Sequence, residues 1–356
     1  MAKPTTAEDV EGTRGGVATA TKKPGPDDQP QDPSERERLA RQSDRGRDAD
    51  RAGEIPAKGW KDIAKRVAKE VKADNVPLLA AGVAFYALLS LVPGIVAIVS
   101  IYGLVTEPAE VARQLESLTR TLPQDAASLI TEQVEKIAGA SSGKLGISVV
   151  VGILTALWSA SSGMKWMLAA LSLTYDEREE RKFLKLRGTA LLLTVGAAIA
   201  LPVALGLIGA TGALARALGL GDAGELAISV LRWPLLFALV IVGLAVLYKY
   251  GPDRDAPKWR WVSWGSVIAA IIWVLASAAF ALYTSLAGNY QESYGSLAGV
   301  VVLMLWLFLT CFSVLLGSEI NAEMEHQTAH DTTKGPDVPL GARGATVADE
   351  VGEPAD

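Results

Sequence analysis

Six long runs of uncharged residues, separated by strongly charged stretches, constrain this chain more than any other feature of its sequence. Apart from Lys165 in the second run, they contain no Asp, Glu, Lys or Arg, and they cover residues 76–106, 145–175, 188–215, 233–248, 261–290 and 293–318. Because a helix rises ~1.5 Å per residue, ~20 apolar residues cross the ~30 Å hydrocarbon core of a bilayer. Five runs are long enough, whereas the fourth covers only ~24 Å. The pattern predicts an all-α, polytopic membrane bundle with six transmembrane helices over residues 76–322.

The two ends of the chain differ from this central part in composition. Residues 1–56 and 323–356 are rich in Pro, Gly and charged residues and poor in large apolar residues. Such segments bury too little apolar surface to offset the conformational entropy that is lost on ordering. We therefore expect two disordered tails, of which the C-terminal one is acidic.

Net charge and cysteine content exclude several classes of protein. The formal net charge is −5 and the isoelectric point is about 5.3, which argues against a nucleic-acid partner because neutralising phosphates needs a basic surface. The single cysteine, Cys311, lies in an apolar run, so we expect neither a disulfide framework nor a thiol metal site, and no cofactor. The N-terminus lacks an apolar core with a cleavage site, so the first span is expected to serve as the signal.

Basic residues in the loops predict the orientation. The loops after the second and fourth runs are rich in Lys and Arg. The turn after the third run has Arg216 as its basic residue, and the turn after the fifth run has no basic residue. The basic residues of the two rich loops are Arg178, Arg181, Lys182, Lys185, Arg187, Lys249, Arg254, Lys258 and Arg260. By the positive-inside rule, both termini are cytoplasmic.

Two segments outside the runs have amphipathic patterns. Residues 57–75 place Trp60, Ile63 and Val67 at helical spacing among lysines, which predicts an interfacial helix whose residues 57–72 contact anionic lipid headgroups. A solvated linker helix is the alternative. Residues 107–140 form further amphipathic stretches, which we expect to cover the outer mouth of the bundle.

A few polar groups fall at membrane depth. Lys165 lies ten residues before Tyr175 and thus ~15 Å from the inner boundary, near the midplane, where a charge costs at least ~2.5 kcal/mol. It either faces the bundle interior, where it could contact a substrate, or snorkels toward water. Ser161 belongs to the small-residue stretch SASSG just before it. Arg232, at the end of the short fourth run, is expected to snorkel or to be paired.

Prolines interrupt two of the predicted spans. Pro93 and Gly94 lie within the first, and Pro202 lies within the third. A proline inside a helix removes one hydrogen bond, and in a membrane the freed carbonyl needs another partner or water. We expect helix breaks at these residues. They would line a cavity or simply kink the helices for packing.

Several stretches, in this order, resemble one family of bacterial inner-membrane proteins. These stretches are AAGVAFYALLSLVPGIVAI, LWSASSG followed by Tyr175, Pro202, RWVSWGSVIAAIIW, YGSLAGVVVLMLW and GSEINAE. Together, from about Trp60 to Glu323, they are similar to the YihY/BrkB family, formerly labelled ribonuclease BN. The resemblance implies a multi-pass protein of the bacterial plasma membrane, for which a transport role has been suspected. It also makes Tyr294, Glu319 and Asn321, which belong to these motifs, candidates for functional positions.

The residues favour transport over catalysis. Hydrolysis of RNA needs a general base with an acid, or carboxylates around metal ions, and the sequence has no Asp, Glu and His cluster at ligand spacing. We therefore expect no enzymatic activity. The leading interpretation is a transporter-like pathway for a small solute or lipid, with Lys165, Ser161, Arg232, Tyr294, Glu319 and Asn321 as candidate residues. The alternative is an envelope-organising scaffold that does not transport. Either is compatible with a homo-oligomer.

Overall fold

The computed structural model describes residues 32–105, 146–209, 219, 221–286 and 297–354. The chain divides into residues 1–31 and a compact unit from Asp32 onward, and everything described below belongs to that unit. The expected outer segment 107–140 and Tyr294 lie outside the described residues. Within the described part of the chain, the secondary structure is helical apart from one isolated β-bridge, Pro257 with Thr333.

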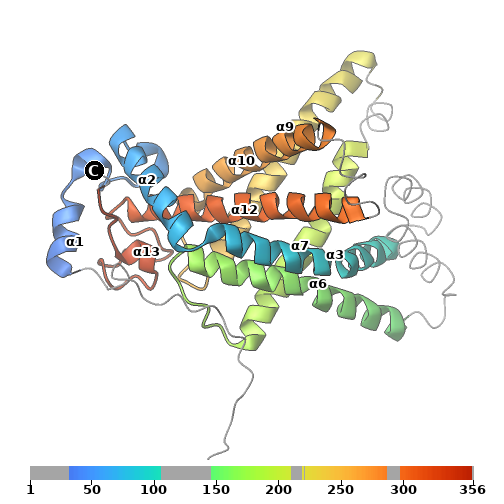
Figure 1. Cartoon of the computed structure of the whole chain (residues 1–356), viewed down its shortest axis with the longest axis horizontal. Coiled ribbons are helices and arrows are strands. Elements are labelled where there is room, and N and C mark those ends of the chain that lie inside the picture. Colours follow the sequence, from blue (N-terminus) through green and yellow to red (C-terminus); the bar gives the residue numbers. More distant parts are fainter. Residues whose placement is uncertain (1–31, 106–145, 210–218, 220, 287–296, 355–356) are drawn as a thin grey trace, which may run out of the picture. The chain divides into compact units, whose positions relative to one another are not determined.

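Six long helices correspond one to one to the six uncharged runs (Figure 1). They are α3 (Val76–Val105), α6 (Gly146–Thr174), α7 (Phe183–Gly209), α9 (Asp222–Tyr250), α10 (Trp259–Leu286) and α12 (Ala298–His326). Five are long and apolar enough to cross a membrane. The sixth, α6, also has 29 residues and carries Lys165 and several serines in its middle. The predicted all-α bundle is confirmed.

The fourth span is longer than its uncharged run. Its apolar segment extends over Leu226–Tyr250, so Arg232 lies inside α9 and not at its end. The Arg232 guanidinium donates to the carbonyl of Ile208 at 3.3 Å and lies over the Trp233 ring, 5.4 Å from its centroid. Because these contacts satisfy part of the guanidinium, the helix continues through the charge.

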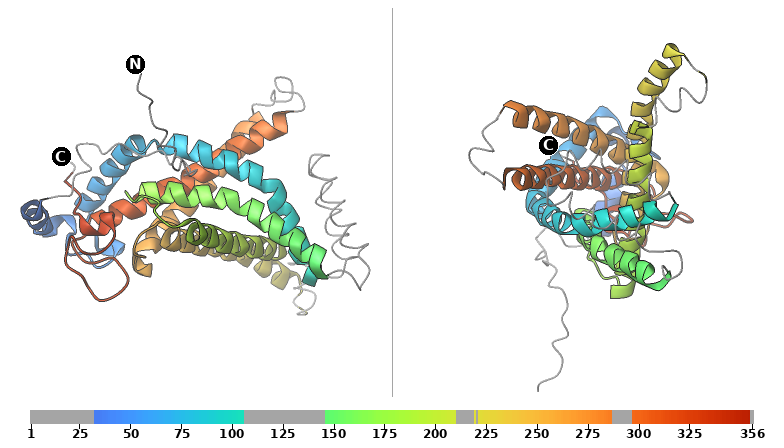
Figure 2. Two further views of the ribbon diagram at one scale, coloured as in Figure 1. Left: turned by 90° about the horizontal axis from the view of Figure 1, so that it is seen from below. Right: turned by 90° about the vertical axis from the view of Figure 1, so that its right-hand side faces the viewer.

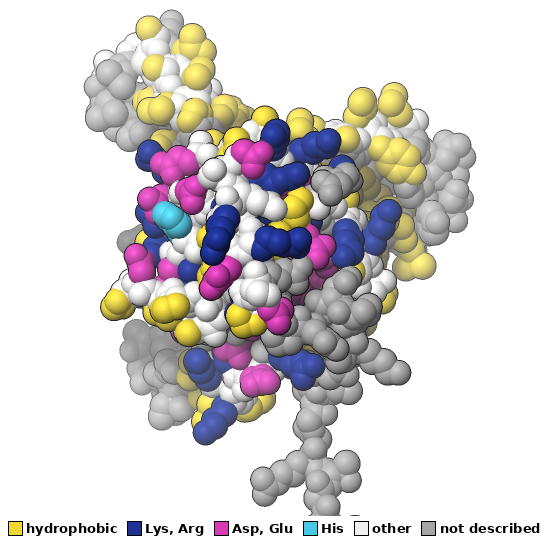
Figure 3. Space-filling model, turned by 90° about the vertical axis from the view of Figure 1, so that its left-hand side faces the viewer, with side chains coloured by type: hydrophobic (Ala, Val, Ile, Leu, Met, Phe, Trp, Pro, Cys, Tyr) yellow, Lys and Arg dark blue, Asp and Glu magenta, His cyan; other side chains and the backbone are white. Residues whose placement is uncertain are grey.

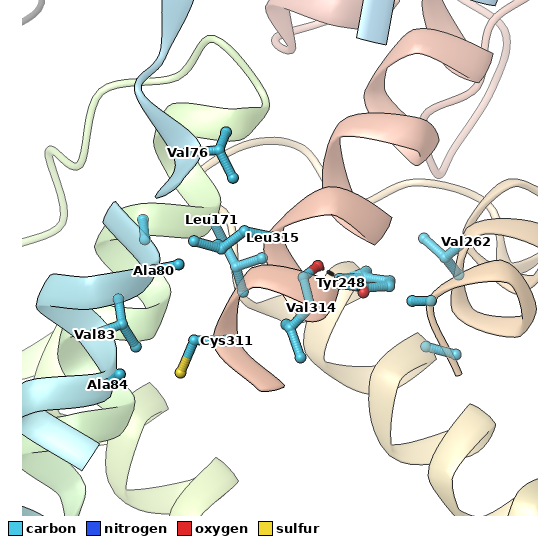
Figure 4. Packing of buried hydrophobic residues seen from close by; sticks show 13 residues of the cluster. Val76, Ala80, Val83, Ala84, Leu171, Tyr248, Val262, Cys311, Val314 and Leu315 are labelled. Atoms are coloured by element: carbon cyan, nitrogen blue, oxygen red, sulfur yellow. Dashed lines mark hydrogen bonds between the residues drawn. The ribbon is translucent and has the colours of Figure 1, made fainter. Parts of the chain in front are cut away.

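The helix core forms where α12 packs on α3 and α10, and α3 packs along α6 (Figures 1 and 2). Figure 4 shows its centre, in which Val83 of α3, Leu171 of α6, Tyr248 of α9 and Leu315 of α12 point toward one another. The buried Tyr248 hydroxyl donates to the carbonyl of Val314 at 2.8 Å. Apolar packing and one satisfied hydroxyl therefore join four helices.

The predicted helix breaks do not occur. Both α3 and α7 continue through Pro93 and Pro202, respectively, because a proline removes a single hydrogen bond while the turns on either side keep theirs. Close approach of α3 to α6 explains the small residues nearby. The Gly163 amide donates to Ser90 Oγ at 2.9 Å, and a Cβ on Gly163 would lie 3.3 Å from Ala87 Cα.

Both chain ends that were expected to be disordered are packed where the structure describes them. Residues 41–56 and 327–354, here called the terminal cap, contact each other and the end of α12. The terminal cap contains the short helices η1 (Ser43–Arg45), η2 (Ala52–Glu54) and α13 (Thr346–Asp349), and helix α1 (Pro33–Ala40) precedes it. Figure 3 looks onto this end, where basic and acidic side chains intermingle.

Arginine hydrogen bonds to carbonyl oxygens replace a large apolar core in the terminal cap. Arg47, which is fully buried, donates to the carbonyls of Gln327, at 3.1 Å, and Gly352. Arg343 donates to those of Ala329 and Ala348, both at 2.7 Å. Burial, together with repulsion from a neighbouring arginine, lowers the pKa of Arg47 to about 10, so it stays protonated at neutral pH. The prediction of disorder considered only apolar burial and therefore missed this order.

Helix α2 (Ala57–Ala73) covers the same end of the bundle. Ile63 and Val67, two residues of its expected lipid-facing stripe, are buried in a cluster with Trp261 and Met324. The apolar stripe therefore faces protein instead of lipid. The exposed side carries Lys61, Lys65 and Lys72 among other residues.

Candidate functional site

The motif GSEINAE, residues 317–323, lies at the capped end of α12 and is buried almost throughout. A Cβ on Gly317 would overlap with both the Tyr248 hydroxyl and Ala269 Cβ, so the helices meet here only because residue 317 has no side chain. Next to it, the hydroxyls of Ser318 and Thr174 lie 2.8 Å apart. The motif thus joins α12 to α6, α9 and α10.

Asn321 occupies the space beside another glycine. Its Oδ1 accepts from the amide of Gly265 in α10 at 3.1 Å, and a Cβ on Gly265 would overlap with the Asn321 amide. The Asn321 side chain also lies close enough to the Tyr175 hydroxyl to act on it. The hydroxyl of Tyr175, which follows α6, is also buried in this region, and burial raises the pKa of Tyr175 well above its usual value.

Glu319 is the least satisfied member of this group. It is only 2% exposed, and its Oε1 has no hydrogen-bond partner among the residues that the structure describes. The charges that act on it come from other carboxylates, including Asp74, Asp176 and Glu323. We call Ser318, Glu319 and Asn321, with Thr174 and Tyr175, the α12 polar cluster. A buried carboxyl without a cation beside it is costly, and such groups in membrane proteins are found mainly where function requires them.

A second group of polar side chains lies where α7 begins beside α6. Arg187 of α7 is 9% exposed, and its Nη2 donates to the Trp158 carbonyl at 2.9 Å and to Ser162 Oγ at 3.3 Å. Its guanidinium also lies over the Trp158 ring, 4.3 Å from the centroid. Lys165, one turn along α6 from Ser162, has its ammonium 4.6 Å from the centroid of the Trp166 ring. We call Lys165 and Arg187 the cation pair.

The cation pair lies where α7 begins beside the middle of α6. Phe183, the first residue of α7, contacts Trp158, with ring centroids 6.4 Å apart, and Arg187 follows one turn later. The middle of α6 is therefore level with the start of α7, which crosses it obliquely in Figure 1. The last turns of α6, after Lys165, extend past the start of α7 toward the terminal cap.

The candidate residues therefore divide among several places. Glu319 and Asn321 lie together in the α12 polar cluster, and Lys165 belongs to the cation pair. Ser161 is fully buried, and its hydroxyl bonds the Trp158 carbonyl of its own helix at 2.8 Å, so it is already satisfied. Arg232 lies apart from both groups, on α9 against Ile208.

Sequence reasoning missed Arg187 and Tyr175 as parts of these groups. Arg187 was counted only among the basic loop residues, although a charge directly beside the uncharged run 188–215 could have been noticed. Nothing in the sequence showed that the loop before it returns along α6. Both histidines belong to residues 323–356, which were expected to form a disordered tail. In the structure His326 lies in α12 beside Glu323 at 3.6 Å, and His330 contacts Asp50 at 2.9 Å.

A bundle of long apolar helices with buried polar groups at its helix contacts defines a multi-pass helical membrane protein. The family model of the virulence factor BrkB matches residues 67–340. The chain belongs to this BrkB family, as its motifs indicated.

The relatives of this chain include a ribonuclease-like protein and several membrane proteins. The ribonuclease-like protein YfkH of Bacillus subtilis (strain 168) is 32% identical over 246 residues, which cover 68% of this chain and 87% of YfkH. A UPF0761 membrane protein of Verminephrobacter eiseniae is 26% identical over 288 residues, or 76% of this chain and 64% of the relative. A UPF0761 membrane protein of Tolumonas auensis is 33% identical over 101 residues, which cover 28% of this chain and 33% of the relative. No solved structure matches.

Proposed function

We propose that this protein forms a transporter-like pathway for a small solute or lipid across the bacterial plasma membrane. The observation that carries the proposal is Glu319, a buried carboxyl at the capped end of the bundle whose Oε1 has no partner among the described residues. Polar groups left unpaired inside a membrane bundle are costly, and they mark substrate or ion pathways more often than they stabilise a fold.

The same proposal places both termini in the cytoplasm. The terminal cap, the loop 175–182 and the loop 251–258 lie at one end of the bundle, joined by contacts such as Thr346 N to Glu177 Oε1 at 2.7 Å and Lys258 N to the Thr332 carbonyl at 2.7 Å. These loops carry the basic residues on which the positive-inside rule depends. The exposed lysines of α2 then face the inner leaflet and attract anionic headgroups.

We also propose that the protein is not an enzyme. The word ribonuclease-like belongs to the name of YfkH, and the chemistry of the described residues here does not favour it. Each histidine is paired with one carboxylate, and that of His326, Glu323, is already held by Arg66 at 2.5 Å. Among the described residues, no three His, Cys, Asp or Glu side chains are placed to hold a metal ion.

Thiol labelling separates a pathway from a scaffold. In a Cys311→Ser background, which removes the single native thiol, Glu319→Cys should react with a small charged thiol reagent added to membranes. The matched control is Leu315→Cys, one turn away on α12 and fully buried in the apolar core, which should stay inert. If both thiols stay inert in variants that insert into the membrane at wild-type levels, water does not reach residue 319 and the pathway is wrong.

A further inference from the structure

The cation pair has no carboxylate to balance it among the described residues. Lys165 and Arg187 are close enough for the guanidinium to act electrostatically on the ammonium. The contacts of Arg187 are the Trp158 carbonyl and ring and the Ser162 hydroxyl, and the contact of Lys165 is the Trp166 ring. All of these partners are neutral. Two like charges held together in a partly buried place repel each other, so the folded protein gains if an anion binds between them.

The arrangement leaves hydrogen-bonding capacity unused. Arg187 is 9% exposed, yet its Nε is buried without a partner in the described part of the chain. The Ser162 hydroxyl accepts from both terminal nitrogens of Arg187, at 3.3 Å each, so its own hydrogen is free to be donated. The Lys165 ammonium keeps three donors, with an aromatic ring as its contact.

The donor types match the chemistry of a phosphate group. A guanidinium fork binds two oxygens of a phosphate at once, and a lysine ammonium supplies a compact point charge to a third. The residues around the pair are apolar and exposed, with Phe183 64% and Leu184 80% exposed on the first turn of α7. An apolar flank beside a cationic group suits a molecule that has both a phosphate and acyl chains.

We propose that Lys165, Arg187 and Ser162 bind a phosphate group, supplied by the headgroup of an anionic phospholipid whose chains lie along the start of α7. This proposal names a ligand for the proposed transporter-like function, and any movement of the lipid across the membrane depends on that function. Binding itself requires no transport, so it is tested separately.

The experiment is native mass spectrometry of the full-length protein in a non-ionic detergent with added lipid. Phosphatidylglycerol should form adducts, whereas diacylglycerol with the same chains and no phosphate should not. Arg187→Gln and Lys165→Gln should each weaken phosphatidylglycerol binding by about ten-fold, the worth of one charged hydrogen bond. Lys185→Gln, an exposed cation half a turn from Arg187 on α7, is the matched control and should bind like wild type.

Each other outcome is informative. Equal binding by Arg187→Gln and Lys185→Gln would overturn the site, as would equal binding of diacylglycerol and phosphatidylglycerol. Inorganic phosphate that displaces the lipid supports the shared phosphate chemistry, and phosphate binding without lipid binding would overturn the lipid as its source. If Arg187→Gln misfolds, Lys165→Gln carries the test. If the protein binds the headgroup but its Glu319→Cys variant does not react with the thiol reagent, the pathway is contradicted and the headgroup site is supported.

Discussion

The capped end of α12 and the start of α7 both hold charged side chains against apolar helices, but they balance that charge differently. At the capped end, Arg254 and Glu325 form a two-pronged ion pair with the closer oxygen at 2.7 Å, and their side chains are 1% and 0% exposed. Arg66 Nε donates to Glu323 Oε2 at 2.5 Å, and Arg66 Nη2 donates to the Glu323 carbonyl at 3.1 Å. At the start of α7, Lys165 and Arg187 contact neutral groups instead.

The difference is not a shortage of acidic residues, because the chain has 39 Asp and Glu against 34 Lys and Arg. Carboxylates are placed beside Arg254 and Arg66 at the capped end, where an unpaired buried charge would destabilise the fold. Among the described residues, no carboxylate contacts the cation pair, so a ligand can supply the negative charge. The comparison therefore separates charge that holds the structure together from charge that is available for binding.

The largest expected effect follows from breaking a pair at the capped end. Glu325→Gln leaves Arg254 buried without its counter-charge and should lower the free energy of unfolding by about 3–5 kcal/mol. Urea unfolding in detergent micelles measures it. Replacing both residues, Arg254→Met with Glu325→Leu, should recover most of the loss because no charge stays buried.

The exposed pair Lys58 with Asp44, at 2.9 Å and with side chains 69% and 61% exposed, is the control for that measurement. Asp44→Asn should not change the unfolding curve measurably, because water screens the pair. Equal effects of Glu325→Gln and Asp44→Asn would remove the distinction between the two kinds of charge.

A smaller effect is expected from Gly317→Ala, next to the α12 polar cluster. The added methyl group meets the Tyr248 hydroxyl and Ala269, so α9 and α10 must move, at a cost of about 1–3 kcal/mol. Gly243→Ala in α9, where no heavy atom lies within 4 Å of the new Cβ, should be neutral or slightly stabilising. The melting temperatures of the two variants give the comparison. A Gly317→Ala protein as stable as Gly243→Ala would mean that the motif is loosely packed.

The smallest expected change in stability concerns Lys165. Lys165→Met should leave expression and the melting temperature unchanged or slightly raised, because no carboxylate among the described residues loses a partner. It should nevertheless reduce complementation of a deletion strain, and Lys165→Arg should restore part of the activity because the charge persists. Protein levels are measured in parallel. Full activity from a well-expressed Lys165→Met protein would remove this residue from the functional site.

The sequence predicted the helices well and their mutual arrangement poorly. Absence of charge defines where a chain can enter a bilayer, and it located all six long helices, including the extent of α3 and α10. It carries no information on tilt or offset between neighbours, which packing decides. The depth of Lys165, counted from Tyr175 along one straight span, therefore remains a prediction, and the sequence did not show that α7 begins beside the middle of α6.

The candidate site was predictable to a similar degree. Glu319 and Asn321 could be found because they belong to a motif, and the structure adds that they share one buried cluster with Tyr175 and Gly265. Arg187 could not be assigned, since its role depends on which helix its loop returns to. The terminal cap escaped prediction because its order depends on arginines bonding carbonyls far away in sequence, such as Arg47 with Gly352.

The terminal cap also relates folding to the order of synthesis. Residues 41–56 leave the ribosome first, yet Arg47 and the carbonyl of Ala49 bond residues that follow the last span, including Thr328 at 2.6 Å. The N-terminal segment must therefore wait, with its arginine still hydrated, until all six long helices and nearly the whole chain have been made. Closure of the cap therefore requires that the segment after α12 has been made, because that segment supplies the carbonyls that Arg47 binds.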